Sequence, residues 1–297
     1  MHTHAEEQQV NSSPRPESIR AVAVRHPGRW AAVGAVGVLL AMLGHAIVTN
    51  PKLQWHRVWD ILWDPTVLMG LQTTLLLTVL AMVIGSIGGL FLTVMRLSHN
   101  PLLSGPAWLF IWVFRGTPVL VQLFIWNFLG ALWPRISIGI PFGPEFHSWA
   151  YNDLVSLPTA AVLCLGLNEA AYMAEIVRAG ILSVGEGQSD AAASLGMTRR
   201  QTMRRIMLPQ AMRVIVPPTG NEAIAMLKIT SLVSAISLVD VTRAGQDIAS
   251  RTFENMPALI AVSIWYLAFT SLLMIGQYFI ERRYGRGTSR LIPAKAA

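Results

Sequence analysis

The sequence has few of the residues from which soluble enzymes and small secreted domains build their sites. Only 13% of its 297 residues are charged, against 53% that are hydrophobic, which is too apolar for a soluble domain of this size. Its one cysteine, Cys164, lies in an apolar run, so an intrachain disulfide is excluded and a small core residue is the favoured interpretation. Zinc-ligand spacing, a phosphate-binding glycine loop and a plausible catalytic triad are all missing. Any ATP-driven step therefore needs another chain to bind the nucleotide.

Long windows nearly free of charge predict a helical membrane protein. A bilayer-spanning helix needs about 20 mostly apolar residues. Six windows qualify: 30–48, 67–95, 119–133, 157–182, 219–239 and 257–280. The predicted fold class is therefore all-α, a polytopic membrane protein with about six transmembrane helices. The segment before the first window is too long for a cleavable signal peptide, which predicts a permanent span.

The basic residues are distributed unevenly between the two sides that these spans define. With the N-terminus inside, 17 of the 23 lysines and arginines fall in cytoplasmic segments, 5 fall in outer segments and Lys228 lies within a span. This positive-inside bias predicts that both termini are cytoplasmic. The net charge of +7 therefore reflects topology in a lipid bilayer, and no nucleic-acid partner is expected.

Composition also predicts how the chain is divided. Residues 1–29 are rich in Pro, Ser, Glu, Gln and Arg and are expected to form a disordered cytoplasmic tail, in which His2 and His4 are expected to be inert. Residues 30–65 hold an extra first transmembrane helix and an external loop. Residues 66–284 form the core, and residues 285–297 a cytoplasmic C-terminal tail.

The longest polar and basic segment between apolar windows is the loop formed by residues 187–218. It reads GQSDAAASLGMTRRQTMRRIMLPQAMRVIVPP. Ser189 is expected to cap a first short helix with Asp190 in its first turn, and Gly196 suits the left-handed residue that ends such a helix. Thr198 and Gln201 have the spacing of a capping box that opens a second helix. A charge run is usually a solvated loop, but this one predicts two helices that meet at a sharp corner.

The spacing within this loop resembles a known family. Its matching residues are Asp190, Ala191, Ala192, Gly196, Ile206, Leu208 and Pro209, which reproduce the pattern EAA, three residues, G, nine residues, I, one residue, LP. The chain thereby resembles the membrane-spanning subunit of binding-protein-dependent ATP-binding-cassette (ABC) importers, most closely the polar amino-acid branch. The runs RGTPVLVQLF and AAYMAEIVRAGI are also similar to that branch. Asp190 stands where the family usually has Glu, which shortens the reach of this carboxylate.

The resemblance implies a type I importer permease bundle over residues 72–284, preceded by one extra span. It implies that the 187–209 part of the loop is a coupling helix on a cytoplasmic ATPase. The implied coupling residues are Ser189, Asp190, Ala191, Ala192, Leu195, Gly196 and Met197. The implied partners are ATP-binding cassette subunits that carry ATP and Mg, an extracytoplasmic amino-acid-binding protein and a second permease subunit. The chain itself is expected to be a transport subunit of the cytoplasmic (inner) membrane, not an enzyme, with no cofactor or metal of its own.

Polar residues inside the apolar windows are the candidates for a substrate pathway. Carboxylates within a span are costly and generally face the bundle interior, and residues three and four apart share a helix face. The predicted pathway residues are Gln122, Asn168, Glu169, Tyr172, Glu222 and Lys228. Glu175 precedes Arg178 by three residues, which predicts a local ion pair. Lys228 is expected to find Glu169 or Glu175 on another helix, and a structural ion pair is as good an interpretation as a substrate or gate role.

Two helix interruptions are also predicted. The first lies at Arg115, Gly116, Thr117 and Pro118, where Thr117 can cap a helix that restarts with Pro118 at its first position. An interrupted helix at membrane depth generally lines a cavity or is buried in protein, so these residues are pathway candidates. The second is expected at residues 217–218, a Pro-Pro pair before the fifth span.

Three tryptophans recur every fourth residue in the first external segment. Trp55, Trp59 and Trp63 would lie on one face of a short helix. Tryptophan favours the membrane–water interface. A helix anchored among the lipid headgroups is the favoured interpretation, and a docking surface for an external partner is the alternative.

Two other classes of function stay open on the sequence. In an ion-gradient-driven secondary transporter, Glu169, Glu222 and Lys228 would be the coupling groups, although no internal repeat is present of the kind that many such transporters have. In a membrane scaffold, no solute would be moved. ATP-dependent uptake distinguishes the importer from both.

Overall fold

The computed structural model describes residues 27–140 and 143–285. The chain divides into two units, residues 1–51 and 52–297, and each is described by itself. The first holds α1 (Pro27–Thr49), which begins at Pro27 rather than at the expected Trp30 and is long and apolar enough to cross a membrane. The predicted disordered tails, with His2 and His4, lie outside the described residues apart from positions 27–29 and 285.

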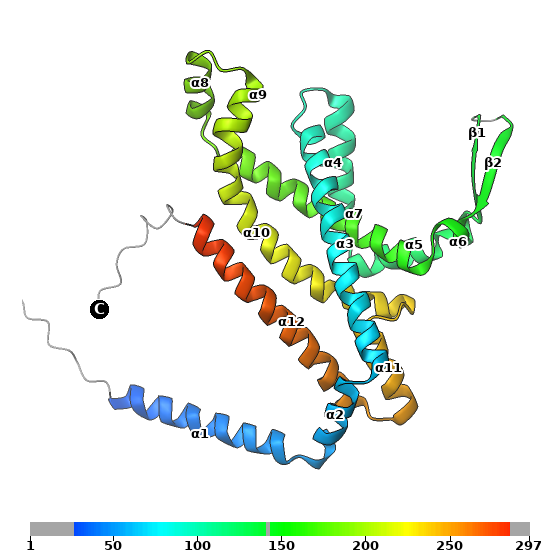
Figure 1. Cartoon of the computed structure of the whole chain (residues 1–297), viewed down its shortest axis with the longest axis vertical. Helices are drawn as coiled ribbons and strands as arrows, with labels where there is room; N and C mark the ends of the chain where they lie inside the picture. Colours follow the sequence, from blue (N-terminus) through cyan, green and yellow to red (C-terminus); the bar gives the residue numbers. More distant parts are fainter. Residues whose placement is uncertain (1–26, 141–142, 286–297) are drawn as a thin grey trace, which may run out of the picture. The chain divides into compact units, whose positions relative to one another are not determined.

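The second unit holds the remaining elements, most of which are helices (Figure 1). In chain order they are η1 (Pro51–Leu53, which straddles the division), α2 (Trp55–Leu62), α3 (Pro65–Arg96), α4 (Pro101–Gly116), α5 (Val119–Leu132), β1 (Arg135–Gly139), β2 (Glu145–Ala150), α6 (Tyr151–Leu154), α7 (Leu157–Leu182), α8 (Glu186–Ser194), α9 (Arg199–Thr202), the π-helical turn η2 (Met203–Met207), α10 (Leu208–Ile229), the 3-10 segment η3 (Thr230–Ile236), α11 (Val241–Thr252) and α12 (Asn255–Tyr284). The predicted all-α membrane fold is confirmed.

Side-chain caps determine where two of the helices begin. The Asp64 carboxylate accepts a hydrogen bond of 2.8 Å from the Thr66 N–H before α3. The Asn100 side-chain Oδ1 accepts a hydrogen bond of 3.0 Å from the Leu102 N–H before α4. In both helices a proline occupies the first turn, where its missing N–H costs nothing.

The spans agree with the predicted windows in number, but the windows at 119–133 and 219–239 each cover only part of a bent pair of helices. Over the described residues, four helices are long and apolar enough to cross a membrane, namely α1, α3, α7 and α12. Two bent pairs bring the number to six: α4 with α5, which meet at 108°, and residues 199–236 with α11, which meet at 45°. The window at 119–133 is therefore only one arm of a broken span, because α5 alone has 14 residues.

The expected helix break at Pro217 and Pro218 does not occur, since both prolines lie inside α10. Pro217 and Pro218 remove the helical hydrogen bonds to the carbonyls of residues 213 and 214, yet the helix continues through them. Here α12 packs along α10 (Figure 1), and the Gln277 Nε2 donates a 2.8 Å hydrogen bond to the Pro217 carbonyl. This contact comes from a residue far along the chain, which is why the local sequence did not indicate it.

The most extensive helix contact is between α3 and α7. Glycines on both helices accept side chains of the other, Gly85 against Glu169 and Gly166 against Ile84. The buried Thr93 hydroxyl also lies 2.9 Å from the Ala174 carbonyl across the interface. Small residues of this kind allow the two backbones to approach closely, which fixes the position of α7 against α3.

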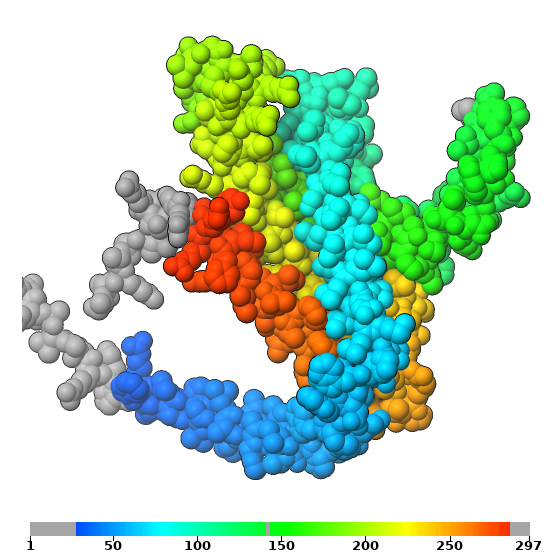
Figure 2. All heavy atoms as spheres, viewed as in Figure 1, coloured from blue at the N-terminus to red at the C-terminus, as the bar shows by residue number. Residues whose placement is uncertain are grey.

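The segment between α5 and α7 contains a two-stranded hairpin. β1 and β2 pair antiparallel, with Ile136 opposite Trp149 and an irregularity between Ile138 and Gly139. Figures 1 and 2 show the hairpin projecting from the helices of this unit. At its base, the buried Tyr151 donates a 3.0 Å hydrogen bond to the Trp126 carbonyl of α5.

The short helix α2 forms as predicted and is held to the start of α12. The Arg57 guanidinium binds the Glu254 carboxylate through two hydrogen bonds of 2.8 Å. Trp59 and Trp63 meet edge to face with ring centroids 5.9 Å apart, and both are exposed. Anchoring of this helix among lipid headgroups stays a prediction.

Candidate functional site

The predicted corner exists, but its first helix begins earlier than expected. α8 starts at Glu186 with Gly185 as its N-cap residue, so Ser189 and Asp190 lie within the helix and the predicted Ser189 cap is wrong. Glycine is also a favourable N-cap residue, and Glu186 supplies the acid that the first turn of a helix favours. Val184, just before the cap, is buried in the core with residues of α7 and α10, and this packing determines where the chain turns.

The turn between α8 and α9 has the predicted geometry. Gly196 has a φ of +73°, its N–H bonds the Ala193 carbonyl at 2.9 Å, and the Met197 N–H bonds the Ala192 carbonyl at 3.0 Å. These two bonds make a complete Schellman motif. Thr198 and Gln201 then form the predicted capping box before α9. The Schellman motif and the capping box together bond the backbone groups that the ends of α8 and α9 leave free. This corner, residues 192–201, is therefore held in one conformation.

The seven predicted coupling residues surround this turn. Ala192 is buried, Met197 is half-buried, and the others are exposed: Ser189, Asp190, Ala191, Leu195 and Gly196. The Leu195 side chain is 81% exposed, which makes it the main apolar group at the corner. In Figure 1, α8 and α9 lie at one end of the second unit, and α2 and α11 lie at the opposite end.

The broken span α4–α5 is held by two amide side chains. Asn168 of α7 donates from Nδ2 to the Phe114 carbonyl at 3.0 Å and to Gln122 Oε1 at 3.2 Å. Gln122 donates from Nε2 to the Phe114 carbonyl at 2.9 Å and to Thr117 Oγ1 at 2.8 Å. The break is therefore where predicted, but the N-cap residue of α5 is Pro118 rather than Thr117, with no side-chain cap bond, so Pro118 is not the first helical residue. The predicted Thr117 cap is wrong, because the Thr117 hydroxyl donates a 2.8 Å hydrogen bond to the Val113 carbonyl of α4. Both amides are buried and bonded within the protein.

Glu169 differs from its neighbour Asn168 in having no such partner. Its side chain packs against Gly85 of α3 and the residue is 2% exposed. Within the described part of the chain, the Glu169 Oε1 accepts no hydrogen bond. A buried carboxyl group without a partner is costly, and a carboxyl group within a span is a candidate functional group.

A cation, the Arg115 guanidinium, contacts α7 at Tyr172, three residues from Glu169. The Arg115 guanidinium, at the end of α4, is 5.1 Å from the centre of the Tyr172 ring, a cation–π contact. Glu175 is bound by Arg178 at 2.7 Å, the ion pair that their spacing predicted. Gly116, beside Arg115, has open space around its α-carbon.

The comparison with known proteins decides the family. A family described as binding-protein-dependent transport system inner membrane component matches residues 82–286, which includes the bent span, the acids of α7 and α10, and the whole corner. The chain belongs to this family. It is therefore a permease subunit of an ABC importer, as the loop spacing indicated.

Named relatives of this permease transport amino acids. The arginine transport system permease protein ArgU of Corynebacterium glutamicum is 45% identical over 96% of this chain and 89% of its own length. The glutamine transport system permease protein GlnP of Escherichia coli K12 is 34% identical over 78% of this chain and 98% of its own. A crystal structure of an amino acid ABC transporter with histidines matches with a TM-score of 0.64 and 37% identity, over 74% of this permease and 95% of that chain.

Lys228 does not join the other predicted pathway residues. Its side chain is exposed near the end of α10, and the ion pairs of the described residues do not include it. The predicted pairing of Lys228 with Glu169 or Glu175 is therefore wrong. Glu175 is already bound by Arg178, and Glu222 and Lys228 are six residues apart on one helix, so they point in different directions.

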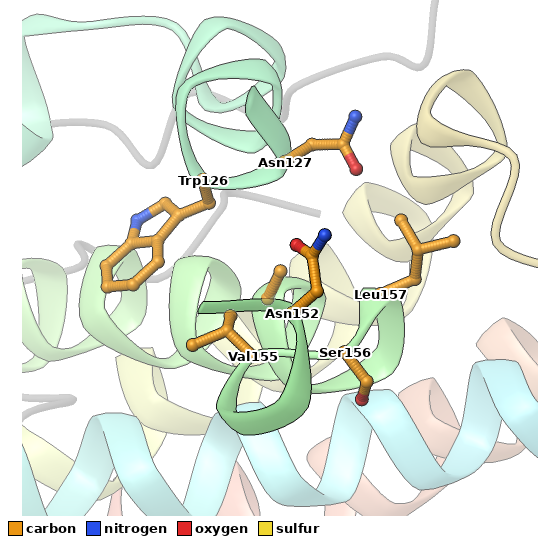
Figure 3. Close-up of a pocket in the computed structure, with 7 residues that line it drawn as sticks. Trp126, Asn127, Asn152, Val155, Ser156 and Leu157 are labelled. Carbon is orange, nitrogen blue, oxygen red and sulfur yellow. The ribbon is translucent and has the colours of Figure 1, made fainter. Parts of the chain in front are cut away.

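A cavity of about 420 Å³ lies between α5, α6 and the start of α7. Its lining residues are Trp126, Asn127, Asn152, Val155, Ser156, Leu157 and Ala160. Figure 3 shows the Asn127 and Asn152 side chains pointing toward each other. None of the lining residues is charged, and the cavity does not include Glu169 or Glu222. No group of three or more metal-binding side chains occurs among residues 27–140 and 143–285.

Two contacts of this permease were missed by sequence reasoning. Arg115 was predicted as a pathway candidate through the helix interruption, but its contact with α7 was not predicted. Its position four residues beyond Ile111, on the buried face of α4, could have indicated this contact. Gln277 was not considered at all, although a glutamine within an apolar span needs hydrogen-bond partners from another helix.

Proposed function

We propose that this permease imports a cationic amino acid, driven by ATP hydrolysis on separate subunits. The observation that carries the proposal is the Glu169 Oε1, a buried carboxyl oxygen that accepts no hydrogen bond in the described structure. A ligand with an ammonium or guanidinium group would supply both the donor and the opposite charge that this carboxylate lacks. The 45% identity with a permease named for arginine transport supports the same substrate class.

An amino acid also carries a carboxylate, which needs a cation in the same pathway. Arg115 meets this need because its guanidinium lies over the Tyr172 ring, and Tyr172 is three residues from Glu169 on α7. The proposed pathway therefore places two acids, Glu169 and Glu222, opposite one base. Gln122 and Asn168 have a supporting role, since their amides hold the α4–α5 bend that carries Arg115.

The corner is the proposed contact with the ATPase subunits, which would bind ATP and Mg. Leu195 would enter a partner groove while the Schellman motif and the capping box keep the turn rigid. The helix continues from α9 through η2 into α10 with no intervening loop. A displacement of the corner would therefore move α10. This movement would change the packing of the spans from one discrete arrangement to another.

The remaining parts of the proposal follow from the family and from the distribution of charge. The corner and both termini would face the cytoplasm, because most of the basic residues lie in these segments. An extracytoplasmic binding protein would deliver the amino acid at the opposite face. A second permease subunit would complete the pathway, and the complex would reside in the inner membrane.

Reconstitution into vesicles tests this function. The permease is assembled with candidate ATPase subunits and the binding protein, and uptake of labelled arginine is measured with ATP, without ATP, and with an imposed ion gradient. Uptake that requires ATP supports the importer. Uptake driven by the gradient without the ATPase subunits would establish a secondary transporter, and no uptake with any combination of partners and solutes would favour a scaffold.

The substrate class is tested by Glu169→Gln, with Glu175→Gln as the control. A hydrogen bond to a charged group contributes about 1.5–3 kcal/mol, so the Glu169 variant should lose about tenfold to a hundredfold in kcat/KM for arginine and lysine, and much less for neutral amino acids. Glu175 is already bound by Arg178, so its variant should not change the preference. An equal loss for both classes of substrate would leave Glu169 with a structural role only.

A further inference from the structure

The weakest turn of α10 lies at residues 217–220, which we call the proline turn. Pro217 and Pro218 have no N–H, so the carbonyl groups four residues earlier receive no helical hydrogen bond. Gly220 follows, and glycine lowers helix stability by about 1 kcal/mol relative to alanine. A helix that transmits a displacement along its axis is most easily bent at such a point.

Gln277 of α12 is inserted against this turn. Its Nε2 donates hydrogen bonds of 2.8 Å to the Pro217 carbonyl and of 2.8 Å to the Glu281 carboxylate. A Cβ atom at Gly220 would overlap the Gln277 Oε1, so the amide occupies space that only glycine leaves free. Reversing the amide would place its oxygen against two other oxygens, so the orientation of Gln277 is determined.

The oxygen of the same amide is left without a donor. Gln277 is 6% exposed, and its Oε1 accepts no hydrogen bond from any described residue. A buried acceptor without a partner costs about 1–3 kcal/mol. This cost is accepted at the point where α12 contacts the proline turn, which makes the amide unlike an ordinary packing residue.

We infer that Gln277 is a positioning residue that couples the two halves of α10 across the proline turn. The corner leads through α9 and η2 directly into α10, and Glu222 lies five residues beyond Pro217 on the same helix. With Gln277 bound to the turn, movement of the corner is passed on to Glu222. Without it, bending at the proline turn absorbs the movement. The inference rests on the proposed function, in which the corner is moved by ATPase subunits.

The measurement that tests this role is the number of solute molecules transported per ATP hydrolysed by the reconstituted complex. Gln277→Met keeps the length of the side chain but removes both hydrogen bonds, and Gln277→Asn keeps the amide but shortens its reach. Both variants should retain ATP hydrolysis and lose at least fivefold in the ratio. The control, Glu281→Gln, keeps an acceptor for the Gln277 N–H and should show the wild-type ratio.

Three outcomes would overturn the inference. The first is an unchanged ratio in both Gln277 variants. The second is a fall of transport and ATP hydrolysis by the same factor. The third is failure of both variants to insert and assemble, which would show that Gln277 only maintains the fold. Wild-type complex without ATP-dependent uptake is a separate result, because it rejects the proposed function itself.

Discussion

The rigid turn at Gly196 allows a graded test of the corner. With φ at +73° and nothing within 4 Å of an added Cβ, Gly196→Ala carries only the backbone cost of the left-handed conformation, about 1–2 kcal/mol. Gly196→Asn should cost less, because asparagine tolerates this conformation. Gly196→Pro cannot adopt it, since proline holds φ near −65°, and it also removes the N–H that bonds the Ala193 carbonyl. Its cost should be about 3 kcal/mol or more.

These costs predict an order of affinity for the ATPase subunits. If the partner binds only the formed turn, its apparent Kd rises as the population of that turn falls. The loss should be at most about tenfold for Asn, larger for Ala, and more than a hundredfold for Pro, for which uptake should be abolished. Affinity is measured by titrating labelled ATPase subunits onto each variant in nanodiscs. Thermal unfolding of the membrane core is the control and should not change. Wild-type binding and transport by the Pro variant, or equal impairment of Ala and Pro, would refute the reasoning.

Three further predictions concern contacts within the permease. Gly85→Val should destabilise the α3–α7 contact by about 1–3 kcal/mol because its side chain would overlap Glu169, and a lower Tm in detergent would show it. Arg57 holds the pKa of Glu254 below its ordinary value. The pair therefore stabilises the α2–α12 junction fully at a pH above the ordinary pKa of a glutamate, and this stabilisation is lost as the pH falls through the lowered pKa. The expected result is a Tm that falls in acid, and that falls less in Arg57→Gln. Thr198→Ala removes one side of the capping box and should cost about 1 kcal/mol, seen as faster proteolysis at the corner with no change in the Tm of the core.

Features that depend on short stretches of sequence were predicted correctly. The spans follow from apolar runs whose length matches the bilayer. The Schellman turn at Gly196, the capping box at Thr198 and the Glu175–Arg178 pair each involve residues within six positions of each other. Geometry over so few residues is fixed by the backbone and by helix periodicity, and no knowledge of the packing was needed.

The errors arose where a distant part of the chain decides between local alternatives. Burial of Val184 starts α8 at Glu186, although Ser189 would also have been a good cap. Gln277 supports α10 through Pro217, 60 residues away. The Arg57–Glu254 pair joins residues 197 positions apart, and no periodicity relates them.

If Glu169 reads the substrate as proposed, its direct contact with Gly85 means that substrate choice and bundle assembly share one point in space. A larger residue at position 169 would crowd α3 at Gly85, and a larger residue at position 85 would overlap the Cβ and Cγ of Glu169. Attempts to re-engineer the selectivity of this permease at position 169 should therefore vary the two positions together. Libraries that keep their combined volume constant should yield more inserted, active transporters than libraries that vary position 169 alone.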